Sequence, residues 1–130
     1  MGAMELFDLS GKAAIVTGGG RGLGFALAEA LADAGCNLML CSRKAVSCEE
    51  AAGKLEQTGV TAVGQKCDIT DSSDVTALRD AALKAFGKID ILVNNSGAAW
   101  GAATEDYPLK GWKKVIDVNV TGTFLCSQIV

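Results

Sequence analysis

Apolar residues in this chain form short continuous runs that alternate with longer segments of helical periodicity. The runs occupy positions 12–17, 37–41, 60–67 and 89–93, and each is typical of a strand that is buried on both faces. Between the runs, and from about Lys110 to the end, apolar positions recur at intervals of three and four residues. The pattern predicts four strands and four helices, the first three helices over 22–34, 45–57 and 72–86.

Residues that begin and end helices stand at the edges of these segments. Gly35, Gly59 and Gly87 follow the three predicted helices, where a glycine can adopt the left-handed conformation that ends a helix. Ser72 or Ser73 is placed to cap the third helix. The core face of that helix is predicted to consist of Val75, Leu78, Ala82, Ala85 and Phe86.

Strands that alternate with helices, and that are apolar throughout, predict βαβ units around a parallel sheet. We expect a doubly wound α/β fold in three layers, α/β/α, with one domain over residues 1–130 and no internal linker. In such a sheet, ligands bind beyond the carboxyl ends of the strands, where the strand order reverses. Residues 1–3 precede a second methionine, Met4, and are a candidate cloning remnant.

A glycine-rich turn follows the first predicted strand and opens the first helix. It reads Thr17-Gly-Gly-Gly-Arg-Gly-Leu-Gly24, and its glycine spacing differs from the dinucleotide fingerprint G-x-G-x-x-G. A strand that turns through glycines into a helix presents bare backbone N–H groups, a ready site for a phosphate or pyrophosphate. The alternative is a tight turn in which glycine only permits close packing of helix on strand.

Two further polar motifs stand at the ends of other strands. Asn94-Asn-Ser-Gly97 follows the fourth strand, where it would flank the same crevice as the glycine turn and could line a ligand, brace the neighbouring strand, or form an ordinary polar turn. Asp68 ends the third strand and could accept a hydrogen bond from an adenine amino group. Alternatively, Asp68 caps the following helix or forms an Asx-turn, although Asp71 and Ser72 are better placed to cap that helix.

Asn119 lies among apolar residues of the last predicted helix. A buried amide there costs stability unless it is hydrogen-bonded, and Gly122 weakens the same helix. Together they indicate a local kink or a functional site, the alternative being a satisfied core amide.

Composition and charge exclude several classes of protein. The chain carries a net charge of −3 without a basic stripe, so nucleic acid is not an expected partner; the pair Lys113-Lys114 is interpreted as a solvated helix face. There is no membrane-length apolar run and no recognisable signal peptide. The absence of histidine and of metal-binding spacing predicts no metal site. Five cysteines without CxxC pairing predict reduced, mostly buried thiols and a cytoplasmic protein.

The residues after the second strand bear on the choice of coenzyme. NAD-binding proteins place an acidic side chain there for the ribose 2′-hydroxyl, but this chain has Ser42-Arg43. Arg43, with Arg21 from the glycine turn, could bind a 2′-phosphate, so NADP is favoured over NAD. The alternative is that both are solvated surface arginines.

Taken together, the glycine turn, Asp68, the Asn94–Gly97 motif and Asn119 resemble the short-chain dehydrogenase/reductase family over nearly the whole chain. The likeness is greatest to NADP-using carbonyl and alcohol reductases and to gluconate-type dehydrogenases. One departure is Ser96, where the family usually has alanine. The resemblance implies a Rossmann-type fold with strand order 3-2-1-4 and reversible hydride transfer between NADP(H) and a small-molecule carbonyl or secondary alcohol.

The resemblance also implies roles for individual residues. The glycine turn would hold the pyrophosphate, Asp68 and Ile69 would contact adenine, and the Asn94–Gly97 motif would lie along the ribose and nicotinamide. Asn119 would belong to the catalytic tetrad and hold a water in its proton relay. The predicted cofactor-binding residues are Gly18, Gly20, Arg21, Gly22, Leu23, Gly24, Ser42, Arg43, Asp68, Ile69, Asn95, Ser96 and Gly97.

The family's catalytic Ser and Tyr-x-x-x-Lys have no match in this chain. Tyr107 is the only tyrosine, and the residue four positions later is Gly111, with Lys110 one place too early. We therefore expect a cofactor-binding half, truncated after the fourth helix and inactive alone. A catalytically silent nucleotide-binding or interaction module is the alternative. The apolar run 89–93 at a sheet edge and the apolar last helix predict a homo-oligomer.

Overall fold

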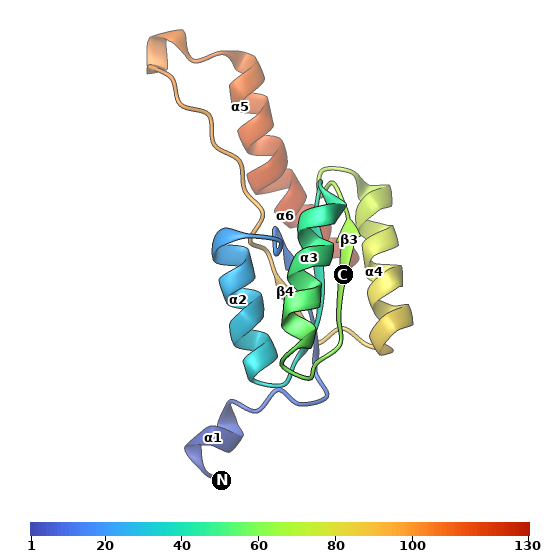
Figure 1. The fold of residues 1–130 in the computed structure, drawn as a ribbon. Coiled ribbons are helices and arrows are strands. Elements are labelled where there is room, and N and C mark those ends of the chain that lie inside the picture. The colour runs from blue at the N-terminus through green and yellow to red at the C-terminus, as the bar shows by residue number, and fades with distance from the viewer.

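A four-stranded parallel sheet forms the centre of the computed structural model, which describes all 130 residues (Figure 1). The strands are ordered β3-β2-β1-β4, as predicted. Their bounds are β1 (Ala13–Thr17), β2 (Asn37–Ser42), β3 (Ala62–Lys66) and β4 (Ile91–Val93). Because β1 and β4 are neighbouring parallel strands, their carboxyl ends lie at the same end of the sheet, and the loops after them meet there.

Two apolar cores pack against opposite faces of the sheet, and this confirms the three layers. One core joins Ala14, Val16 and Leu38 of the strands to α2 (Gly22–Asp33) and α3 (Ala45–Glu56). The other joins Ile15 and Met39 to α4 (Ser72–Phe86) and to Cys126 of the last helix. Neighbouring strand residues therefore serve opposite cores, which is why the strands read as continuous apolar runs.

The last helical segment is continuous but not regular. It consists of α5 (Leu109–Ile116), a π-helical stretch η2 (Asp117–Gly122) and α6 (Thr123–Ile129). Gly122 is buried against Ile69, and a Cβ on it would lie 2.6 Å from Ile69 Cδ1. A π turn therefore stands where Asn119 and Gly122 predicted an irregularity, and such turns are frequent at functional sites.

Of the cap candidates that the sequence offered for α4, Asp71 forms the cap, because its Oδ1 accepts from Ser73 N at 2.9 Å. Two short elements were not predicted. The structure adds α1 (Ala3–Leu6) and the 3-10 turn η1 (Thr104–Asp106), both too short to show a hydrophobic period. None of the helices combines the length and apolar character that a bilayer span requires.

The fourth strand is also shorter than the run at 89–93, although the Asp90 amide still donates to the Ala13 carbonyl at 2.8 Å. The Ala13 amide donates to Asp90 Oδ2 at 2.9 Å, so a carboxylate takes the place of a partner-strand carbonyl. Lys88 Nζ lies 3.3 Å from the same oxygen. These contacts fix where β1 and β4 begin to pair, and the exposed edge is three residues long.

All five cysteines are unpaired and buried, as predicted. Burial raises the pKa of Cys126 to about 11 and raises that of Cys36. The thiols are consequently part of the apolar cores.

Asp90 is expected to make the fold sensitive to acid. The hydrogen bond from Ala13, and then Lys88, hold the Asp90 pKa below its ordinary value. A lowered pKa stabilises the fold above the unfolded-state pKa of about 4, and this contribution is lost as the pH falls through the folded-state pKa. Asp90→Asn should therefore lower the melting temperature at neutral pH. The melting temperature of the variant should also fall less than that of the wild type as the pH drops below ~4. Equal acid sensitivity of Asp90→Asn and the wild type would contradict this, with Glu105→Gln as the surface control.

Candidate cofactor site

The glycine turn after β1 leaves the start of α2 open. Gly18 and Gly22 have φ values of +65° and +56°, which side chains other than glycine rarely adopt. No atom lies within 4 Å of a Cβ built on Gly22, and no side chain caps α2 at Arg21. The first-turn N–H groups of α2 are thus without a side-chain partner, and the helix dipole favours an anion there.

Other glycines of the same turn serve packing. A Cβ on Gly24 would overlap the Gly18 carbonyl and lie 2.5 Å from Asn95 Nδ2. A Cβ on Gly20 would lie 2.8 Å from Ser47 Oγ of α3. Gly20 and Gly24 therefore permit close packing, whereas Gly22 faces open space, and the phosphate site stays a prediction.

Thr17 ties the glycine turn to the loop after β4. Its hydroxyl accepts from the amides of Asn95 and Ser96, both at 3.0 Å, and donates to the Val93 carbonyl at 3.3 Å. A hydroxyl has one donor and two acceptor positions, so its capacity is filled. Thr17 is 1% exposed and is the one buried polar residue of the chain.

Asn95 reinforces this connection from the other side. Its Nδ2 donates to the carbonyls of Thr17 and Gly18, at 3.1 and 3.3 Å. Of the roles that the sequence left open, the side chain performs the bracing one. Ser96 lies beside Gly18, since its Oγ would be 3.2 Å from a Cβ there.

Asn119 connects the π turn to the same loop. Its Oδ1 accepts from Ala98 N at 3.1 Å and its Nδ2 donates to Ala98 O at 2.8 Å. A Cβ on Gly97 would lie 3.0 Å from Asn119 Oδ1. The structure therefore brings Asn119 next to Gly97, with the side chain exposed and paired to the backbone, unlike a core amide.

Asp68 and Ile69, which are predicted to contact adenine, follow β3. Asp68 Oδ1 accepts from the Thr70 amide at 2.9 Å and the Thr70 hydroxyl at 2.7 Å, which is the Asx-turn that the sequence allowed. Ile69 is buried against the π turn, so its side chain faces the core and only its backbone remains for a ligand.

Both predicted phosphate-binding arginines are exposed, and so is Leu23 at the start of α2. Arg43 also lines a cavity of about 610 Å³ together with Asp68 and with lysines of α5. Ser42 Oγ bonds to the Lys44 backbone, donating to its carbonyl at 2.7 Å. Ser42 therefore holds the turn after β2.

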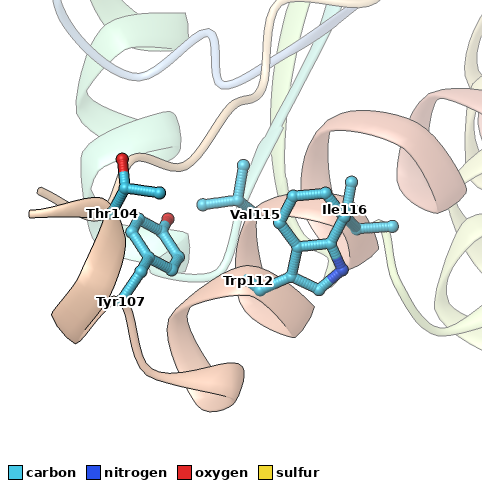
Figure 2. Close-up of a pocket in the computed structure, with 5 residues that line it drawn as sticks. All are labelled: Thr104, Tyr107, Trp112, Val115 and Ile116. Carbon is cyan, nitrogen blue, oxygen red and sulfur yellow. The ribbon is translucent and has the colours of Figure 1, made fainter. Parts of the chain in front are cut away.

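A second, apolar cavity of about 540 Å³ lies between η1 and α5. Figure 2 shows Tyr107 and Thr104 on one side of it and Trp112, Val115 and Ile116 on the other. In Figure 1 this region extends away from the sheet. No residue of the glycine turn lines this cavity beside Tyr107. Neither cavity was predicted, because each needs α5 side chains to meet another segment of the chain.

Comparisons with known proteins identify the family. A sequence profile of the short chain dehydrogenase family matches residues 12–130. A rhamnolipid-biosynthesis 3-oxoacyl-[acyl-carrier-protein] reductase of Pseudomonas aeruginosa is 40% identical over 122 residues, which cover 94% of this chain and 47% of that protein. The chain belongs to the short-chain dehydrogenase family.

Comparisons with solved structures support the same family assignment. The Pseudomonas aeruginosa RhlG/NADP active-site complex superimposes with a TM-score of 0.88 at 40% identity, covering 95% of this chain and 48% of that one. An NAD⁺-bound xylitol dehydrogenase superimposes with a TM-score of 0.90 at 35% identity, covering 94% and 47%. The chain thus spans about half the length of the relatives it matches, and they include proteins solved with either coenzyme.

The Thr17 hydroxyl offers a direct test of how the site is assembled. Thr17→Val keeps the shape but leaves the buried amides of Asn95 and Ser96 without an acceptor, which should cost about 2 kcal/mol or more of unfolding free energy. Thr17→Ser keeps the hydroxyl and is the matched control. Chemical denaturation measures both, and a Thr17→Val loss no larger than that of Thr17→Ser would contradict the assigned role.

Proposed function

We propose that this chain forms the NADP(H)-binding half of an oxidoreductase that transfers hydride between the coenzyme and a carbonyl or secondary alcohol. The observation that carries the proposal is the open, uncapped start of α2 beside Gly22, held in place by Thr17 and Asn95. When bound, the nicotinamide supplies the hydride. This chain's own residues bind and orient the coenzyme.

Each predicted site residue has a place in this proposal. The turn from Gly18 to Gly24 takes the pyrophosphate, and Asp68 with the Ile69 backbone takes the adenine side. The loop from Asn95 to Gly97 lies along the nicotinamide half, where Asn119 holds it through Ala98. Asn119 acts here as a positioning residue, since its side chain is already paired with backbone.

Arg43 is expected to favour NADP over NAD, because it lines a cavity and forms no ion pair. A lost charge-assisted hydrogen bond costs about 1–3 kcal/mol, so Arg43→Ala should reduce the preference for NADPH over NADH by about tenfold. Isothermal titration of both coenzymes measures this, with Arg79→Ala on α4 as the control. Equal affinities of the wild-type chain for NADPH and NADH would contradict the proposed coenzyme.

The 130-residue chain alone is expected to be catalytically inactive. Tyr107 lies in an apolar cavity with Thr104 and Trp112, and without a placed acid/base a bound coenzyme has no proton partner. NADPH oxidation with ketones, aldehydes and sugar carbonyl compounds should remain at the background rate. If the chain shows turnover and Tyr107→Phe abolishes it, Tyr107 is the acid. If the turnover persists in Tyr107→Phe, other residues carry out the reaction. A silent binding module gives the same inactivity, and only a longer polypeptide with restored turnover would distinguish the two.

Self-association is also expected, in keeping with a homo-oligomer in the cytoplasm. The last helical segment buries only Gly111, Gly122 and Cys126, and it exposes apolar side chains along its length: Leu109, Trp112, Val120 and Phe124. Exposed apolar stripes of this kind mark interaction surfaces.

Sedimentation at micromolar concentration should therefore show a dimer or a larger assembly. Phe124→Lys should shift the chain toward monomer, because a charge in an apolar interface is costly. Leu83→Lys, on the exposed side of α4, is the matched control. A wild-type chain that sediments as a stable monomer would overturn the expectation.

A further inference from the structure

The 610 Å³ cavity beside Arg43 has walls from two distant parts of the chain. One wall is the end of β2 and the loop after β3, with Arg43, Asp68 and Thr70. The other is α5 and the start of the π turn, formed by Leu109, Lys110, Lys113, Lys114, Asp117 and Val118. The first wall is the adenosine end of the proposed coenzyme site, so whatever occupies that end also faces α5.

The charge of this cavity is opposite in sign to that of the whole chain. Four cationic side chains line it against two carboxylates, an excess of two positive charges, whereas the chain carries −3. The two ion pairs of the structure are Arg79–Asp80 and Lys88–Asp90, so none of the four cations, all of which are exposed, is in an ion pair. A concave surface concentrates such a field, and this one favours an anion.

The lysines of α5 are not equivalent. Lys114 Nζ lies over the Trp100 ring, 6.0 Å from its centroid, so its charge already has a partner. Lys110 and Lys113 are three residues apart, which places them on one face of the helix. The cationic groups of the cavity without an aromatic partner are therefore Arg43, Lys110 and Lys113.

NADP differs from NAD by one phosphate on the adenosine ribose, and a phosphate monoester carries about −1.5 to −2 charge at neutral pH. This charge is opposite in sign to the net charge of the residues that line the cavity. We propose that Lys110 and Lys113 of α5 bind the 2′-phosphate together with Arg43 and share with it the discrimination against NAD. The inference rests on the proposed function, because it requires the dinucleotide to lie along this edge of the sheet.

The test compares two probes that differ only in the phosphate, adenosine 2′,5′-bisphosphate and adenosine 5′-monophosphate, by isothermal titration with the 130-residue chain. Lys110→Gln/Lys113→Gln should reduce the preference for the bisphosphate by about tenfold or more while leaving the affinity for the monophosphate within about twofold. Lys84→Gln on α4 is the charge-matched control. Raising the salt from about 50 to about 300 mM should weaken the wild-type preference and affect the double variant less.

The outcomes separate this inference from the proposed function. A double variant that keeps the full preference, while Arg43→Ala loses it, would overturn the role of the lysines and leave the NADP site intact. Competition of inorganic phosphate with the bisphosphate at equal affinity would make the cavity a general anion site and would also overturn it. A chain that binds neither NADPH nor either probe would refute both proposals.

Discussion

A single buried hydroxyl determines how the two loops of the site are placed. Thr17 ends β1 and bonds to three backbone groups of the segment from Val93 to Ser96, so the carboxyl ends of β1 and β4 cannot separate without leaving buried polar groups unsatisfied. Asn95 completes the connection through the carbonyls of Thr17 and Gly18. The network reaches the start of the glycine turn at Gly18, and Asn119 is paired with Ala98 of the loop after β4.

Much of the fold could be predicted because it depends on local patterns. Continuous apolar runs distinguish strands covered on both faces, and Leu38 and Met39 in adjacent positions serve opposite cores. The deviations arise where a side chain replaces a backbone partner. The Asp90 carboxylate accepts from the Ala13 amide at the start of β4, and the Asp71 side chain, one of several cap candidates in the sequence, caps α4. A hydrophobic pattern contains no information on such side-chain-to-backbone bonds.

The sequence predicts which residues belong to the site, but it does not predict what each of them contacts. The sequence marks Gly18, Gly22 and Gly24 equally, but only the folded structure distinguishes a glycine that faces open space from one that packs under Asn95. Asn119 was singled out as a polar residue in an apolar helix, and it is an exposed side chain that pairs with Ala98. The sequence indicates a solvated face at Lys113 and Lys114, and both are exposed. Their position beside Arg43 could not be predicted, because it depends on a tertiary contact between segments about seventy residues apart.

The central claim is that the edge of the sheet between the glycine turn and the Asn95–Gly97 loop is a dinucleotide site. Amide NMR spectra recorded during titration with NADPH test it most directly, because each backbone N–H reports its own surroundings. The account predicts saturable shifts at residues 18–24, at Arg43 and at residues 95–97, and no comparable shifts in α1 or in the outer face of α4. Shifts confined to the apolar cavity around Tyr107 and Trp112, or no saturable shifts at all, would contradict it.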